Sequence, residues 1–183
     1  MPKRDKTHLL TCDFFALFEE PYTFILDLVA LKKKYYRLIA TIHPDRFVEA
    51  SDTQKQFALL LSSRFNSGWQ ILSKPLERAC YLLSLQNIII TNQMETTWPK
   101  AWLEEQIAWH ERIDQARYHP SRLKILADEL DTQIDDFYQA LAALLTNDWQ
   151  TAIPIVQKWR FFAKLKQEVD DAIQSLTYSG HRI

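Results

Sequence analysis

Glycine is the residue that most constrains this chain, because only Gly68 and Gly180 occur among its 183 residues. Tight hairpin turns of types I′ and II′ depend on positive backbone φ angles, which glycine adopts most readily. Phosphate-binding loops and dinucleotide-binding fingerprints need several closely spaced glycines. Two isolated glycines supply none of these features. The sequence therefore predicts an all-α fold.

In the first half, apolar residues recur at steps of three and four, which is typical of amphipathic helices. We expect helices over residues 13–18, 27–42 and 57–73, and a fourth over 75–85 that begins with Pro75 in its first turn. The two long helices can share one core only if they run antiparallel. The loop that joins them then lies at the tip of a helical hairpin.

His43-Pro44-Asp45 lies at the start of that loop. Pro44 disfavours helical geometry at His43 and has no backbone N–H, so the preceding helix must end there. An imidazole that donates and accepts hydrogen bonds then stands beside a carboxylate that only accepts them. An ordinary helix-to-loop turn is the alternative for the tripeptide alone. Its position at the tip of a hairpin favours a docking element that a partner protein recognises.

The helix before this loop carries a basic face, which consists of Lys32, Lys33, Lys34 and Arg37. Such a face can attract an acidic partner and accelerate its association, an effect that salt weakens. Most runs of lysine are simply solvated. Because this run directly precedes His43, we favour binding over solvation alone.

The second half predicts a three-helix bundle. Residues 86–97 are mostly polar around three isoleucines and are expected to form a linker, and helices are expected over 99–116, 121–145 and 151–176. We expect Thr151 to cap the last helix, which puts Pro154 in its first turn; a kink at Pro154 is the alternative.

The first of these three helices has more apolar residues than one core stripe requires. The core stripe comprises Trp102, Trp109, Ile113 and Ala116. Leu103 and Ile107 lie about 100 to 140° from it, framed by Glu104, Glu111 and Asp114, and in the last helix Phe161 points away from the core residue Trp159. Apolar residues rimmed by carboxylates are typical of a binding patch. A wide core face is the alternative, and from the residues alone both interpretations stay open.

Several classes of protein fit the sequence poorly. A net charge of −1 argues against a general nucleic-acid binder, and no run approaches the roughly 20 apolar residues of a membrane span. Cys12 and Cys80 are too few for a disulfide framework or a cysteine zinc site, which fits a reducing cytoplasm. No catalytic constellation stands at a useful spacing. We therefore expect a cytoplasmic protein that is not an enzyme and has no cofactor or metal.

Two groups of residues carry a family resemblance. The first resembles a J-domain and comprises 35–47 with its His43-Pro44-Asp45, followed by Phe65-Asn66, Trp69, Leu72, Pro75, Arg78 and Tyr81. The second comprises 81–85 and 159–165, and with it the chain resembles the HscB-type co-chaperones of iron–sulfur cluster assembly. This resemblance implies an extension over 1–12, a J-domain over 13–85, a linker over 86–97 and a three-helix client-binding domain over 98–183.

The resemblance also implies partners and their contact residues. A DnaK-class chaperone of the HscA type, whose ATPase is stimulated, is expected to bind His43, Pro44, Asp45, Lys33, Lys34 and Arg37. The scaffold protein IscU is expected to bind Leu103, Glu104, Ile107, Glu111 and Phe161. A J-domain protein with another client and a purely structural helical adaptor are the alternatives.

The chain departs from the family pattern at a few positions. Glu104 stands where an apolar residue is typical, and Ala108 and Gln115 stand at usual acidic positions. Gly68 replaces an alanine, at a cost of about 0.5–1 kcal/mol in helix propensity. The cysteine quartet that binds zinc in some eukaryotic relatives is absent, so a bacterial-type member is the better match.

Overall fold

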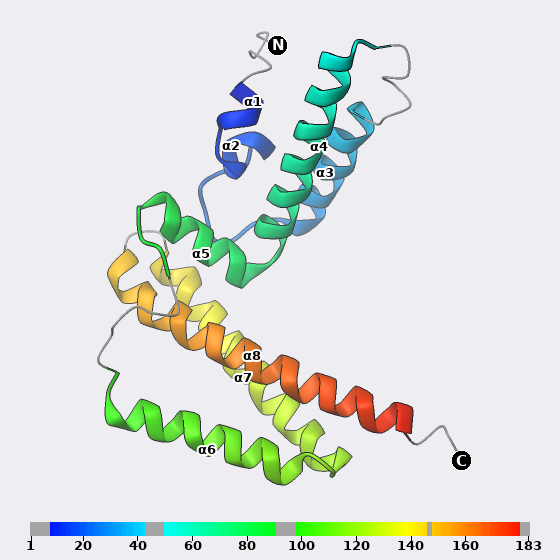
Figure 1. The fold of residues 1–183 in the computed structure, drawn as a ribbon. Helices are drawn as coiled ribbons and strands as arrows, with labels where there is room; N and C mark the ends of the chain where they lie inside the picture. Colours follow the sequence, from blue (N-terminus) through cyan, green and yellow to red (C-terminus); the bar gives the residue numbers. More distant parts are fainter. Residues whose placement is uncertain (1–7, 43–49, 91–97, 146–147, 180–183) are drawn as a thin grey trace. The chain divides into compact units, whose positions relative to one another are not determined.

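The computed structural model describes residues 8–42, 50–90, 98–145 and 148–179. Every regular element within these ranges is a helix, which confirms the all-α prediction (Figure 1). The helices are α1 His8–Thr11, α2 Phe14–Phe18, α3 Leu28–Thr41, α4 Asp52–Ser73, α5 Pro75–Leu85, α6 Lys100–Ala116, α7 Pro120–Leu144 and α8 Trp149–Ser179. The chain divides into two compact units, Met1–Asn87 and Ile88–Ile183, and each is described by itself.

In the first unit α3 and α4 pack together as antiparallel neighbours (Figure 1). Side-chain caps begin both helices, since Asp27 accepts hydrogen bonds from two backbone amides of α3 and Ser51 forms a capping box with Gln54. That box starts α4 five residues before the expected residue 57. Apolar periodicity misses this first turn because its residues are polar and exposed.

The short helix α2 is fixed by a capped first turn and by its buried apolar side chains. Asp13 caps it by accepting a hydrogen bond from the Ala16 amide at 2.9 Å. The same carboxylate accepts the Tyr22 hydroxyl at 2.5 Å, and this hydrogen bond raises the pKa of Tyr22 to about 12. Phe15 and Phe18 are fully buried, as the apolar character of this segment requires.

A buried guanidinium connects three segments of this unit. Arg78, in α5, is only 1% exposed. Its Nε donates to the Phe24 carbonyl at 2.7 Å and its Nη1 donates to the Leu72 carbonyl. These bonds join the loop before α3 to the end of α4 and to α5, so they help to fix the direction in which α3 leaves the loop.

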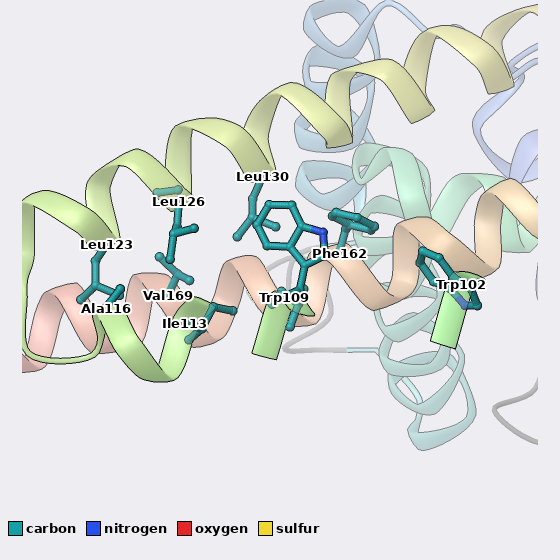
Figure 2. Close-up of a cluster of buried hydrophobic side chains, with 11 residues drawn as sticks. Trp102, Trp109, Ile113, Ala116, Leu123, Leu126, Leu130, Phe162 and Val169 are labelled. Atoms are coloured by element: carbon teal, nitrogen blue, oxygen red, sulfur yellow. The ribbon is translucent and has the colours of Figure 1, made fainter. Parts of the chain in front are cut away.

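In the second unit α6, α7 and α8 enclose one apolar core, part of which Figure 2 shows. All four residues of the predicted α6 stripe are buried, and the aromatic ring of Phe162 packs between Trp102 and Trp109 at centroid distances of 6.1 and 5.5 Å. α7 adds Leu123, Leu126 and Leu130, and α8 adds Leu165 and Val169. The predicted core stripe of α6 is therefore confirmed.

The expected cap of α8 at Thr151 is wrong. Asp148 caps the helix instead, because its Oδ1 accepts the Thr151 amide at 3.1 Å and its carbonyl accepts the Ala152 amide at 3.3 Å. The hydrogen bonds from Thr151 lower the pKa of the Asp148 carboxyl group. α8 therefore begins at Trp149, and Pro154 lies inside the helix, past its first turn.

Candidate functional site

The outer surface of α3 is the first candidate binding surface. Lys32, Lys33 and Arg37 are exposed there, and the last two are separated by one helical turn. Lys34 differs from them, since its Nζ lies 2.6 Å from Glu20 Oε1 and its side chain is 28% exposed. The predicted basic face is thus reduced to three outward-facing cations, which we call the α3 cationic face.

The His43-Pro44-Asp45 tripeptide lies outside the described residues. α3 ends at Thr41, and Ile42 is its C-cap, with the Ile42 amide donating to the Ile39 carbonyl at 3.1 Å. The helix therefore ends directly before His43, within one residue of the end that Pro44 predicts. Lys33 and Arg37 lie on the last three turns of the helix that leads into the tripeptide.

The second candidate surface lies on α6. Leu103 is 48% exposed and Ile107 is 59% exposed, whereas their neighbours Trp102 and Trp109 are 4% and 8% exposed. The two sets occupy different sides of one helix, and Figure 2 shows both tryptophans among the core side chains. Leu103 and Ile107 therefore do not belong to a wide core face. We call these two side chains together with Phe161 the α6–α8 apolar face.

Phe161 lies differently from its prediction. It was expected to face away from the core, yet its ring packs edge-on against Trp102 at a centroid distance of 5.4 Å and against Phe162 at 5.6 Å. The His110 ring also packs edge-on against Phe161, at a centroid distance of 5.8 Å. Phe161 stays partly exposed. Phe161 thus bridges the core and the surface, and its truncation would disturb both.

Charged side chains surround this apolar face. Glu104 and Glu111 are exposed, and the Glu104 carboxylate lies 3.2 Å from Lys100 Nζ, one turn earlier on the same helix. The Lys158 ammonium lies 4.7 Å from the centre of the Trp102 ring. Sequence reasoning missed Lys158 and His110, because only the pairing of α6 with α8 brings them to Phe161 and Trp102.

The described parts of the chain contain neither a metal-binding cluster nor a membrane-spanning helix. Among the described residues, no group of three or more His, Cys, Asp or Glu side chains is placed to hold a metal ion. Across the same ranges, no helix combines the length and the apolar character that crossing a membrane requires.

Comparisons with known proteins point to one family. A family model described as the HSCB C-terminal oligomerisation domain matches residues 99–170. The chain is 39% identical to the Co-chaperone protein HscB homolog of Chromobacterium violaceum over 92% of this chain and 98% of that protein. It is 34% identical to Co-chaperone protein HscB of Proteus mirabilis over 86% of this chain and 94% of that protein.

Solved structures agree with these relatives. The human co-chaperone protein HscB superposes with a TM-score of 0.82 at 25% identity, covering 87% of this chain and 81% of that chain. Chaperone HscB from Vibrio cholerae superposes with a TM-score of 0.80 at 29% identity, covering 90% and 99%. These matches confirm the predicted architecture, a J-domain helical hairpin followed by a three-helix bundle.

Proposed function

Because the chain belongs to the HscB co-chaperone family, we propose that it stimulates the ATPase of a DnaK/HscA-class chaperone and delivers an IscU-type scaffold protein to it. In this role it assists iron–sulfur cluster assembly and transfer, and ATP is hydrolysed in the partner chaperone. Residues 13–85 act as the J-domain, 86–97 as a linker and 98–183 as the client-binding domain.

The observation that carries the chaperone contact is the α3 cationic face, which leads directly into His43-Pro44-Asp45. Lys33 and Arg37 are exposed and follow one another on the same side of the helix. Cations in this arrangement steer an acidic surface toward the tripeptide, and the tripeptide then supplies the specific polar contacts. Lys34 contributes less to steering, because Glu20 already neutralises its charge.

Replacing His43 by Gln tests the chaperone contact. We expect the variant to lose the acceleration of steady-state ATP hydrolysis by the purified DnaK/HscA-class chaperone, because the imidazole that carries the specific contact is gone. Its helicity should stay unchanged, since the substituted residue lies after the end of α3. Full stimulation by His43→Gln would contradict the proposal, and Lys74→Gln, an exposed substitution at the start of α5, is the control.

The client contact rests on the α6–α8 apolar face. Half-exposed aliphatic side chains beside exposed carboxylates form a patch that a partner can bury. Phe161 adds an aromatic ring that is already held in place by Trp102, so little side-chain entropy is lost when it is covered.

Replacing Ile107 by Ala tests the client contact with a matched control. Ile107 and Ile125 are each 59% exposed, but Ile125 lies on α7 outside the apolar face. We expect calorimetry with an IscU-type scaffold to give about tenfold weaker binding for Ile107→Ala, as for a residue at an interface centre, and unchanged binding for Ile125→Ala. Equal affinities for both variants would remove α6 from the client contact, and binding of a different client instead would favour another J-domain role.

We infer a second property from the family model that matches residues 99–170, whose description names an oligomerisation domain. That range includes all of α6 and α7 and most of α8. We therefore propose that the second unit of this chain also associates with a second copy of itself.

A further inference from the structure

A groove of about 650 Å³ lies between the C-terminal end of α6 and the second half of α8. None of its lining residues belongs to the α6–α8 apolar face. Its apolar lining comes from Ile113, Ala172 and Leu176, while charged and polar side chains line the rest. Tyr118 also lines it and is 78% exposed, a large ring left in water at the edge of an apolar surface.

The charged and polar side chains that α8 contributes to the groove form a stripe along the helix. Successive turns of the helix contribute residues three or four positions apart, so the stripe lies on one side of the helix. It comprises Lys164, Gln167, Glu168, Asp171 and Ser175. The sign of the charge changes along this stripe, from Lys164 at one end to Asp171 two helical turns later. Such a stripe is complementary to its own reversed copy.

The other charges of the groove are already compensated within the chain. Arg117 lies 3.3 Å from Glu168 Oε1 and 3.5 Å from Asp114 Oδ1. Within the described residues Lys164 makes no ion pair, and Asp171 accepts only a neutral amide, from Gln167 Nε2 at 2.7 Å. Lys164 and Asp171 are therefore the two charges that remain for a partner.

We propose that a second copy of this chain occupies the groove, with its α8 antiparallel to the first across a two-fold axis that passes between Gln167 and Glu168. A two-fold axis repeats each contact in both directions, so Lys164 meets Asp171 of the other copy and Asp171 meets its Lys164. The Gln167 amide then faces Glu168 of the other copy. A parallel arrangement would place Lys164 against Lys164, and repulsion disfavours it.

The remaining features of the groove fit this occupant. Ala172, Leu176 and the exposed ring of Tyr118 lie beside the charged stripe, so the two-fold axis places apolar contact area on both sides of it. The inference rests on the self-association proposed above and gives that association a surface, a direction and two pairs of contacts.

Exchange of the two charges in the full-length chain tests the surface. Sedimentation velocity over a range of protein concentrations measures the dimer dissociation constant of the unchanged chain and of Lys164→Asp, Asp171→Lys and the double variant. Each single change turns two attractions into two repulsions, so we expect dissociation constants about tenfold or more higher. The double variant restores opposite charges in both pairs and should recover most of the affinity.

Lys124→Asp, on the exposed side of α7, makes the same change of charge outside the groove and should leave the dissociation constant unchanged. Circular dichroism checks that every variant stays helical. A chain that is monomeric at all concentrations overturns both the self-association and the groove. A dimer that the single variants leave intact overturns the groove alone, and one that the double variant fails to restore overturns the antiparallel pairing. Loss of IscU-type scaffold binding by single variants of a monomeric chain would assign the groove to the client instead.

Discussion

At the scale of single residues, Gly68 determines how closely α2 approaches α4. A β-carbon added at Gly68 would lie 2.7 Å from Phe18 Cε2 and 3.0 Å from Phe14 Cδ1. Phe18 is fully buried, so its ring has no free volume into which it can move. Gly68 therefore costs helix propensity but allows two aromatic rings to pack closely against α4. Helical periodicity alone does not reveal why a glycine stands at this position.

Replacing Gly68 by Ala should destabilise the first unit. Alanine gains about 1 kcal/mol in helix propensity, but the added methyl group forces both phenyl rings to shift, and overpacking of this kind costs about 1–3 kcal/mol. We expect a net loss of up to about 2 kcal/mol in the free energy of unfolding, measured by urea denaturation. Ser67→Ala, one residue earlier and exposed, is the control and should be neutral or slightly stabilising. A stabilised Gly68→Ala variant would mean that the rings adjust freely.

At the scale of the helix, α3 combines a basic outer side with an inner side that holds it on α4. Tyr35 stacks on Trp69 at a centroid distance of 5.2 Å, and its hydroxyl donates to Asn66 Oδ1 at 2.9 Å. Leu31, on the inner side of the same helix, is fully buried. The cations can therefore be changed without disturbing the packing of α3.

Reversing two charges of the α3 cationic face should slow the association of the protein with the chaperone. For Lys33→Glu combined with Arg37→Glu, we expect an association rate about tenfold lower at low salt, measured by stopped-flow fluorescence. Raising the salt concentration should slow the unchanged protein more than the variant, because the steering attraction is screened. Lys74→Glu, at the N-cap position of α5, is the control. An identical salt dependence in both proteins would show that these cations do not steer the encounter.

Elements and surfaces differed in how far the sequence could predict them. Periodicity located all the long helices and the core stripe of α6, because burial repeats with the helical period. It placed the starts of α4 and α8 wrongly, since the capping residues Ser51 and Asp148 precede the apolar pattern. Periodicity does not predict which side chains of different elements contact one another. The half-buried position of Phe161 against Trp102 and the ion pair that withdraws Lys34 from the basic face both depend on pairs of elements that sequence spacing does not relate.

At the scale of the whole molecule, the boundary between the two units lies just after α5. Asn87 adopts a positive φ of 60°, and its amide donates to the Ser84 carbonyl at 2.9 Å, so the helix is terminated by a left-handed residue that asparagine tolerates. Each unit has its own buried core on its own side of this residue. Because the two cores are separate, we expect two parts that fold and bind independently.

Cutting the chain between Asn87 and Ile88 should separate the two activities that we propose. The 1–87 fragment is expected to keep stimulating the chaperone ATPase, because the α3 cationic face and His43 lie within it, and the 88–183 fragment is expected to keep binding the scaffold. Their mixture should lose the delivery of scaffold to chaperone, since the effective concentration that one chain provides is gone; for short flexible connections this concentration is of the order of millimolar. Circular dichroism of each fragment establishes that it is folded, and a pull-down of scaffold on immobilised chaperone measures delivery. Delivery by the mixture at micromolar concentrations as efficient as by the intact chain would mean that the connection between the units is dispensable.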